Sequence, residues 1–416
     1  MTLRNKAIKG AVSSLAAAGI LAATGDALAD TACSSLSGTP IVFTGSSASK
    51  PMLKQVSPLL VKLAAPVRLL YQSVGSCQGL SDITTMTKEP ATAVYWDDVS
   101  GAETSCTLAD VAGVIPDVAV SDVFPTSCAN IAVPAGQKDF TGSAQVFNFI
   151  VPPTSKENVI SMEAAFVVFG WGAVTNTIDP WSDPASIFRR APTSGTYTML
   201  SKLIGLDISK LKGTCPDGAA CKAKTGDIVS AVHNADATAP NAAIGIASSD
   251  YADANRGGMS AVKILAYQHK GAACGIYPDT SGTALDKYNV RHGYYPFWGP
   301  LHFVTAVDGT GAPSNKSVAS ALAFFTRQGL TDVAAKKAMI DYEFAAYTVP
   351  QCAMTVRRKA EVAPNDTGLV AYAPDEPCGC YYESKATMAA PKSCVVCADD
   401  SPCGTGKCRY GFCETK

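Results

Sequence analysis

The chain has few histidines, no long hydrophobic run beyond its N-terminal segment and no excess of charge of either sign. Its four histidines, in 416 residues, have no metal-ligand spacing among themselves, so we expect no metal and no cofactor. No stretch after the N-terminal segment reaches the roughly 18 uninterrupted apolar residues of a membrane span. The near balance of 34 basic and 35 acidic residues gives no basic surface for nucleic acid, and no internal repeat indicates a solenoid.

The N-terminal segment has the pattern of a secretory signal peptide. Arg4, Lys6 and Lys9 precede a small apolar run over residues 11–23, and a small-x-small site follows, which predicts cleavage after Ala29. Removal of residues 1–29 takes away three basic residues and one acidic residue, so 31 basic residues face 34 acidic ones and the net charge is −3. We expect a periplasmic or extracellular monomer without a transmembrane segment.

Cysteine, in contrast, is abundant. An exported chain with 15 cysteines is expected to form disulfides, although the odd number leaves one cysteine free or paired with another chain. Seven of them crowd between Cys378 and Cys413, which predicts a small disulfide-rich module over residues 376–416. Cys394 and Cys397 have the spacing of a zinc ribbon, but an oxidising compartment favours disulfides. The module's role is open among attachment to the envelope, a protein partner and protease resistance.

From residue 30 to residue 375, short apolar runs alternate with helical periods, the pattern of an α/β fold. Several predicted strands end in turns of glycine, serine or threonine that open helices. Such turns direct backbone N–H groups and helix dipoles toward one place and suit an anion. The predicted strands cover residues 40–43, 67–71, 118–120, 145–151, 243–247 and 301–304, and the predicted helices begin near residues 51, 162, 194 and 318.

These turns carry polar side chains that suit an oxyanion. Ser49, Ser76, Ser194 and Thr196 would donate from hydroxyl groups, and the Arg190 guanidinium would bind two oxygens at once. Each turn alone is weak evidence, but three of them together with an arginine four residues before a Ser-Gly-Thr sequence form a moderately specific pattern. A competing Ser-x-x-Lys interpretation, with Lys-Thr-Gly at residues 224–226, lacks the third motif that such acyltransferases need. We therefore expect no enzyme.

The same motifs, in the same order, resemble the periplasmic phosphate-binding protein of bacterial ABC phosphate uptake, a type II periplasmic binding protein. The resemblance covers residues 41–347 and is carried by residues 45–51, 71–76, 121–122, 190–196 and 240–245. It implies an α/β fold of two lobes joined by hinge crossovers, in addition to the C-terminal module. Lobe I would take about residues 30–143 and 270–375, and lobe II about residues 144–269.

The resemblance also implies a set of phosphate ligands: Ser49, the Lys50 backbone N–H, Ser76, Asp122, Arg190, Ser194, Gly195 and Thr196. Asp122 is the informative member, because a carboxylate repels a fully ionised oxyanion but accepts a hydrogen bond from one that keeps a proton. That preference favours phosphate over sulfate or molybdate, and it does not separate phosphate from arsenate.

Two departures accompany the resemblance. Lys50 stands where the family has an aromatic residue, and its ammonium group would either strengthen binding or project into solvent. A long insertion between Gly79 and Asp122 is absent from the family. The predicted function is an exported substrate-binding protein that takes phosphate and has an ABC permease as partner. The alternative is a secreted or surface-attached interaction protein that uses the insertion and the cysteine-rich module to bind macromolecules.

Overall fold

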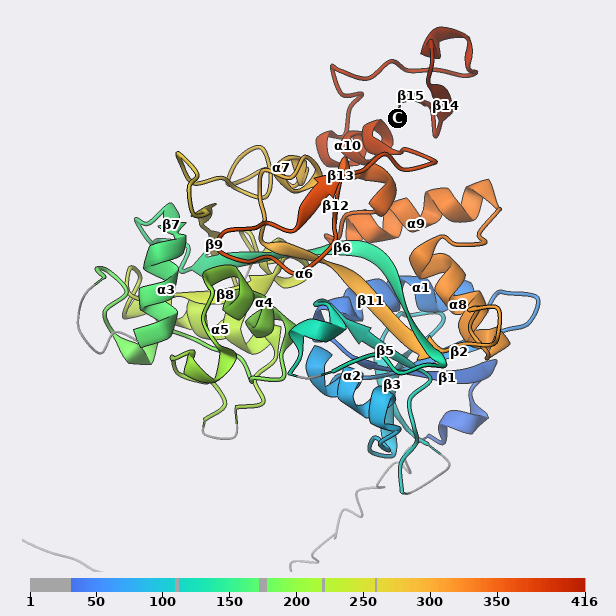
Figure 1. Cartoon of the computed structure of the whole chain (residues 1–416), viewed down its shortest axis with the longest axis horizontal. Coiled ribbons are helices and arrows are strands. Elements are labelled where there is room, and N and C mark those ends of the chain that lie inside the picture. Colours follow the sequence, from blue (N-terminus) through green and yellow to red (C-terminus); the bar gives the residue numbers. More distant parts are fainter. Residues whose placement is uncertain are drawn as a thin grey trace, which may run out of the picture. The chain divides into compact units, whose positions relative to one another are not determined.

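The structure is a computed structural model that describes residues 31–108, 112–129, 131–171, 178–218, 221–258 and 260–415 (Figure 1). The predicted signal peptide and its cleavage site lie outside these residues. The predicted mixed α/β fold is confirmed. In the described part of the chain the α-helices are α1 (Lys50–Leu60), α2 (Ser76–Thr85), α3 (Met162–Trp171), α4 (Gly195–Ile204), α5 (Thr225–Asn234), α6 (Ser249–Ala252), α7 (Tyr288–Arg291), α8 (Lys316–Thr326), α9 (Val333–Ala345) and α10 (Gly379–Thr387).

A single large sheet forms the centre of the described structure, in the order β4-β3-β2-β1-β5-β11-β6-β8, with β9 paired to β6. β1 pairs in parallel with both β2 and β5, so the carboxyl ends of these three strands meet at one edge, where α/β sheets bind their ligands. The strands are β1 (Thr39–Gly45), β2 (Val67–Gln72), β3 (Thr92–Trp96), β4 (Glu103–Thr107), β5 (Val118–Ser121), β6 (Gln137–Val151), β7 (Val159–Ser161), β8 (Gly245–Ser248), β9 (Lys263–Ile264), β10 (Ala266–Gln268), β11 (Trp298–Ala306), β12 (Val356–Arg358), β13 (Leu369–Ala371), β14 (Lys407–Arg409) and β15 (Phe412–Glu414).

β6 links the two ends of this sheet. Its first part is antiparallel to β11, up to the pair Trp298 and Val146, and its last part is antiparallel to β8, from Phe147 to Ile150. The strand predicted over residues 145–151 is therefore present, and it begins earlier, at Gln137. Figure 1 shows β6 and β11 running side by side between the group of α3, α4 and α5 and the group of α1, α2 and α8.

The packing follows from the alternation of side chains along each strand. Ile41 and Phe43 of β1 belong to a hydrophobic cluster that α1 and α8 cover, whereas Val42 between them belongs to a cluster on the other face. In the part of β6 that pairs with β8, Ile150 packs with residues of α5 and β8 in a separate cluster.

The insertion between Gly79 and Asp122 extends the sheet. β3 and β4 form a hairpin that pairs with β2 at the edge. The Trp96 ring is buried and stacks on Tyr71, with 6.2 Å between ring centroids, and Cys106 bonds to Cys33. Arg68 of β2 donates to both carboxylate oxygens of Asp98, at 2.8 and 2.7 Å. The insertion is thus an integral part of this end of the sheet.

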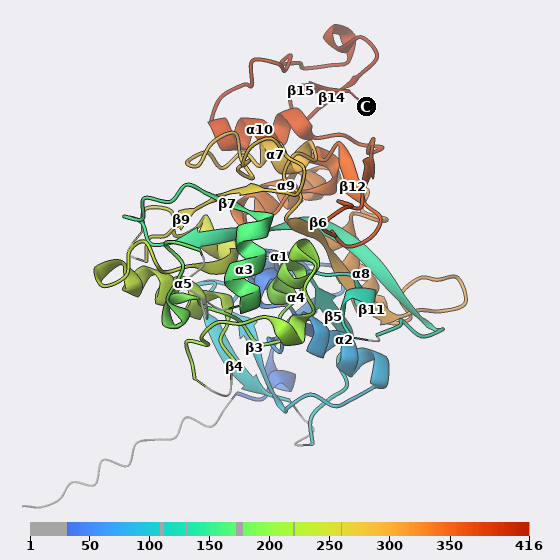
Figure 2. The same cartoon turned by 60° about the vertical axis from the view of Figure 1, so that its left-hand side comes forward.

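The C-terminal module is tied to the rest of the chain. A disulfide joins Cys352 to Cys378, and the predicted disulfides of the module, whose pairing the sequence left open, are Cys380–Cys394, Cys397–Cys408 and Cys403–Cys413. The side chains of Tyr381 and Tyr382 in α10 are buried in the largest hydrophobic cluster, and the Tyr381 hydroxyl donates to Asp341 of α9 at 2.7 Å. Figures 1 and 2 show α10 beside α9.

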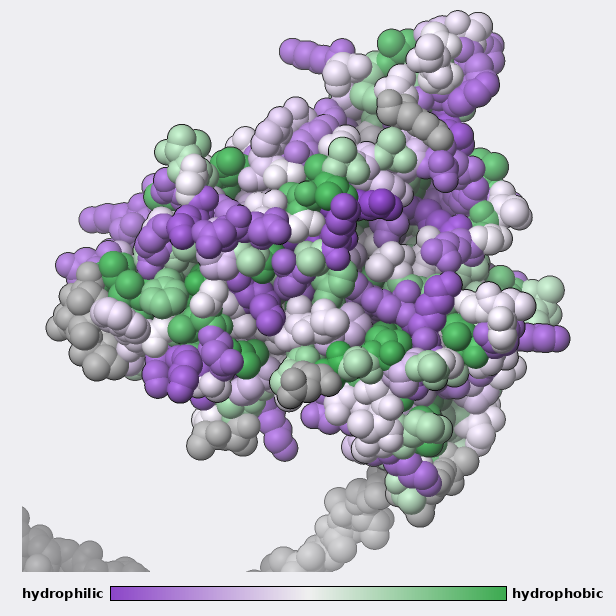
Figure 3. Space-filling view, in the orientation of Figure 1, coloured by the Kyte–Doolittle hydropathy of each residue, from purple (hydrophilic) through white to green (hydrophobic). Residues whose placement is uncertain are grey.

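The remaining cysteines follow the prediction that most of them are bonded. Seven disulfides form in the described residues, and Cys274 is free and exposed. On the face drawn in Figure 3, hydrophobic residues occur in small groups among hydrophilic ones. Within the described residues no helix has both the length and the apolar character to span a bilayer.

Candidate functional site

The turn after β1 supplies the first polar groups of the candidate site. The Ser46 hydroxyl accepts a hydrogen bond from the Ala48 N–H at 3.2 Å and donates to Asp122 Oδ2 at 2.9 Å. The Ser49 hydroxyl, which we expected to face an anion, donates instead to the Ser46 carbonyl at 2.7 Å. In this structure Ser49 therefore holds the shape of the turn, and Ser46 makes the contact with the carboxylate.

Asp122, directly after β5, is the centre of the arrangement. Its side chain is buried and accepts from two hydroxyls, those of Ser46 and of Ser76 at the start of α2, the latter at 2.6 Å. Burial raises the pKa of Asp122, while the two serine hydroxyls and the charge of Arg190 lower it. A buried carboxylate held only by such donors retains acceptor capacity for a further hydrogen-bond donor.

The N-terminus of α4 packs directly against this carboxylate. Gly195 lies so close to it that a Cβ atom at that position would stand 1.6 Å from Asp122 Oδ1 and 2.3 Å from the Ser76 hydroxyl. Ser194 and Thr196 on either side are buried, and the Ser194 hydroxyl has no partner among the described residues. Because the first N–H groups of a helix lack intrahelical partners, α4 brings unpaired donors to the Asp122 carboxylate.

Arg190 is buried and anchored on three sides. Its Nε donates to the Ala223 carbonyl at 2.8 Å, its Nη1 to the Thr225 hydroxyl at the start of α5, and its Nη2 to the Ser47 hydroxyl at 3.3 Å. Burial lowers the pKa of Arg190, and the charge of Asp122 acts against that shift. The guanidinium group is thus fixed in orientation and electrostatically coupled to Asp122.

A cavity of about 470 Å³ opens beside Arg190 and Ser194, and Asp122 lies behind its wall. Its lining includes Arg190, Ser194 and the two exposed lysines Lys222 and Lys224, together with the turn after β2. Four helices, α1, α2, α4 and α5, begin around this region, and each contributes the positive end of its dipole. The lining is therefore cationic and rich in hydrogen-bond donors. The residues in the wall of the cavity are Ser47, Ser73, Val74, Gly75, Arg190, Ala191, Pro192, Thr193, Ser194, Cys221, Lys222, Ala223 and Lys224.

The Lys50 side chain does not take part in this lining. Its ammonium group pairs with Glu103 of β4 at 2.7 Å. Lys50 stands where the family has an aromatic residue, and the insertion supplies Glu103 as the partner of its ammonium group. The ammonium group therefore neither faces the anion site nor projects freely into solvent, the two alternatives that the sequence left open. The backbone role of Lys50 at the start of α1 stays a prediction.

Sequence reasoning missed four residues around the site. Ser46, Ser47 and Thr225 contact Asp122 or Arg190. The first two lie within the motif of residues 45–51 and Thr225 within Lys-Thr-Gly, yet none of them was assigned to the site. Asp250, in α6, is also buried, and burial raises its pKa well above the usual range; its charge couples to Asp122 and to Arg190. A strand end followed by Ser-Asp, as in Ser249-Asp250, was the available signal for it.

The arrangement combines one buried guanidinium, one buried carboxylate with spare acceptor capacity, and several N–H and hydroxyl donors. A guanidinium group and such donors suit an anion, and the carboxylate beside them can accept a hydrogen bond.

Comparison with known proteins gives matches at the level of structure alone. No protein-family profile matches the sequence, and no curated protein sequence does. A substrate-binding protein assigned to a phosphate ABC transporter in Clostridium perfringens, with phosphate bound, is 12% identical and covers 75% of this chain and 99% of its own, with a TM-score of 0.48. An ABC-type phosphate transport receptor from Vibrio cholerae is 14% identical over 75% of this chain and 100% of its own, with a TM-score of 0.46.

The reduced OxyR regulatory domain from Pseudomonas aeruginosa is similar as well, at 9% identity over 70% of this chain and 98% of its own, with a TM-score of 0.39. Proteins of the family that the sequence motifs resemble are thus among the solved structures similar to this chain. These similarities concern the course of the chain, and the chemistry of the site follows from its own residues.

Proposed function

We propose that this protein is an exported substrate-binding protein that holds phosphate between two lobes. The lobes would be those expected from the sequence, about residues 30–143 with 270–375 and about residues 144–269, with β6 and β11 as the crossing strands. Two hydrophobic clusters each fall within one of these lobes, whereas the largest cluster contains residues of both. The seven disulfides support export, because such bonds persist in oxidising compartments. An ABC permease would take the ligand onward.

The observation that carries the proposal is the buried pair of Asp122 and Arg190 at the N-terminus of α4. At neutral pH phosphate keeps a proton that it can donate to Asp122, whereas sulfate has none to give. Arg190 and the α4 N–H groups would bind the remaining oxygens. Arg190 would therefore attract the anion and Asp122 would select one that keeps a proton, and phosphate meets both requirements.

The contacts of such a site would be sufficient for phosphate binding at micromolar concentration. A micromolar dissociation constant corresponds to about −8.2 kcal/mol. Hydrogen bonds to charged groups contribute about 1.5–3 kcal/mol each, so several of them reach this value after the cost of ordering the site. Closure of the lobes would expel water and strengthen each contact.

Calorimetric titration tests the proposal. The protein without residues 1–29, dialysed free of anions, is titrated with phosphate and separately with sulfate, and Arg190→Ala is compared with Arg189→Ala. Arg189 is the matched control, because it carries the same charge next door but bonds to the Gly213 carbonyl at 2.9 Å. We expect selective phosphate binding that Arg190→Ala abolishes and Arg189→Ala preserves. Equal loss in both variants, or no binding by the wild type, would contradict the proposal.

A further inference from the structure

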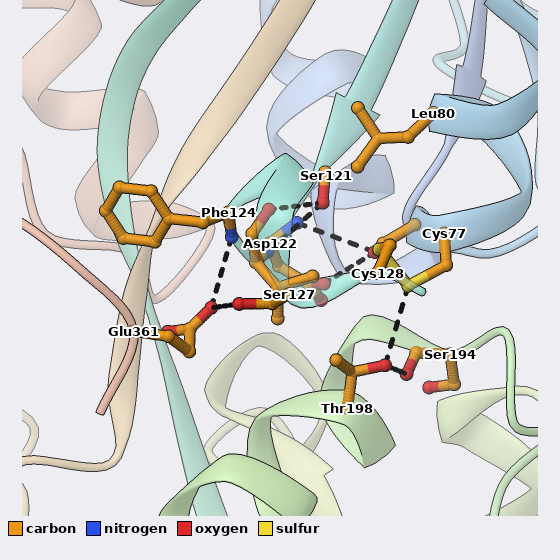
Figure 4. The surroundings of a disulfide bond; sticks show 12 residues. Cys77, Leu80, Ser121, Asp122, Phe124, Ser127, Cys128, Ser194, Thr198 and Glu361 are labelled. Carbon is orange, nitrogen blue, oxygen red and sulfur yellow. Dashed lines mark hydrogen bonds between the residues drawn. A yellow bond between two sulfur atoms is a disulfide. The ribbon is translucent and has the colours of Figure 1, made fainter. Parts of the chain in front are cut away.

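One disulfide lies against the residues of the proposed site. Cys77 directly follows Ser76 in the first turn of α2, and its partner Cys128 ends the short segment that begins at Asp122. Figure 4 shows this bridge between the two segments, with Asp122 and Ser121 on one side and Ser194 and Thr198 on the other. Cys128 is buried, and Cys77 is half-buried.

The bridge joins α2 to the segment that follows β5, two segments that also pack through Leu80 and Val123. Ser76 comes from the turn after β2 and Asp122 from the end of β5, and their contact is the 2.6 Å hydrogen bond from hydroxyl to carboxylate. The disulfide holds the Cα atoms of Cys77 and Cys128 5.2 Å apart. A covalent link this near the contact limits how far Ser76 and Asp122 can separate.

The same bridge reaches α4. The Cys77 sulfur lies 3.6 Å from the Thr198 hydroxyl, which itself donates to the Ser194 carbonyl at 3.0 Å. The Cys77 N–H donates to the Thr193 carbonyl at 3.2 Å. Gly75, with a φ of 99°, fits closely here, because a Cβ would stand 2.8 Å from the same carbonyl. Cys77 therefore contacts the turn and the helix that carry Ser194 and Gly195.

We propose that the Cys77–Cys128 disulfide is a positioning element of the anion site. It fixes Ser76 and Asp122 relative to each other and presents them to the N-terminus of α4, and so it sets both the phosphate affinity and the preference for phosphate over sulfate. The inference rests on the proposed function for its ligand, and on the described contacts for the positioning itself.

A pair of double variants separates positioning from general stabilisation. Cys77→Ala with Cys128→Ala removes the bridge at the site, and Cys33→Ala with Cys106→Ala removes the bridge between the N-terminal segment and β4. The two bridges span 51 and 73 residues, so chain entropy predicts similar losses of stability. We expect both variants to melt at lower temperature. Only the first should bind phosphate about tenfold or more weakly, the loss of one charge-assisted contact, with a smaller phosphate-to-sulfate ratio.

A milder variant covers the case in which the double variant does not fold. Thr198→Val keeps the shape of the side chain and the disulfide but removes the hydroxyl that faces Cys77. We expect weaker phosphate binding with little change in melting temperature. Wild-type affinity and wild-type selectivity in both Thr198→Val and the Cys77 double variant would overturn the inference.

Hydrogen–deuterium exchange without ligand makes failure of the inference distinguishable from failure of the proposed function. Amides of residues 194–198 should exchange faster in the Cys77 double variant, or in Thr198→Val, than in the Cys33 double variant. If the wild type binds no phosphate but this difference appears, the proposed function fails and the positioning stands. Equal exchange in all variants contradicts the positioning, whatever the wild type binds.

Discussion

Gly195→Ala is the substitution whose effect the structure defines most sharply. The added methyl group would stand 1.6 Å from Asp122 Oδ1, whereas ordinary contacts begin at 3.4 Å. The start of α4 and the carboxylate would therefore have to move apart by about 1.8 Å. An ordinary hydrogen bond does not survive such a shift, because its length already lies near 2.9 Å.

The expected loss of affinity follows from the contacts that this shift removes. The first N–H groups of α4 would leave the anion, and two hydrogen bonds to a charged group at about 1.5–3 kcal/mol each amount to roughly 3–6 kcal/mol. That corresponds to a phosphate affinity lower by roughly a hundredfold to ten-thousandfold. Alanine is the better helix former by about 1 kcal/mol, so the helix itself should not suffer.

Calorimetric titration with phosphate measures the effect, and Gly226→Ala is the matched control. Gly226 occupies the first turn of α5, and a Cβ there would meet Tyr251 at 3.2 Å, a contact that a small shift of the ring relieves. We expect Gly226→Ala to bind phosphate within a few-fold of the wild type. Wild-type affinity in Gly195→Ala would refute the close approach of α4 to Asp122 as the basis of binding.

Three further substitutions test single parts of the site and its surroundings. Asp122→Asn should lower the ratio of phosphate affinity to sulfate affinity about tenfold or more in competition titrations, because the amide offers sulfate a donor. Since burial raises the pKa of Asp122, this ratio should also fall in the wild type as pH falls, and an unchanged ratio in Asp122→Asn would exclude Asp122 as the selective group. Lys50→Ala should change phosphate affinity by less than about fivefold, since an exposed ion pair contributes about 0–1 kcal/mol, and a larger loss would assign the ammonium group to the site. Burial and the neighbouring Asp82 raise the pKa of Glu89 to about 8, so the folded chain binds this proton more tightly than the unfolded chain, and the melting temperature should fall as pH rises from about 4.5 to 8. Glu89→Gln should reduce this dependence of melting temperature on pH, and an unaltered dependence would contradict the raised pKa.

The strands and helices around the site could be predicted from the sequence because their signals are local. β1 and β5 are short apolar runs that end at Gly45 and Ser121, β2 ends at Gln72 before a serine, and α4 begins after Pro192-Thr193-Ser194. Such turn chemistry acts within a few residues and is independent of the rest of the fold. The type of these elements was therefore predictable, whereas the start of β6, at Gln137 instead of residue 145, and the hairpin of β3 and β4 were not.

The contacts inside the site depend on segments far apart in the chain, and no local pattern predicts them. Ser46 meets Asp122 across 76 residues, and Arg190 meets Ser47 across 143. The Ser49 hydroxyl donates to a carbonyl in its own turn, and its contact with the ligand stays a prediction. A side chain with two possible partners can be assigned only when the geometry of both is known.

The insertion and the cysteines illustrate the same limit. That the cysteines would be oxidised followed from export, but the partner of each depends on which Cα atoms the fold brings within bonding range. The Lys50–Glu103 pair requires the β3–β4 hairpin to lie beside α1, which the sequence of the hairpin does not reveal.

A crystal structure of the mature protein grown with phosphate is the most direct test of the proposed function. We predict a tetrahedral anion bounded by the Asp122 carboxylate, the Arg190 guanidinium and the first N–H groups of α4. Water alone in that position at saturating phosphate, or phosphate bound only at the protein surface, would contradict the proposed function.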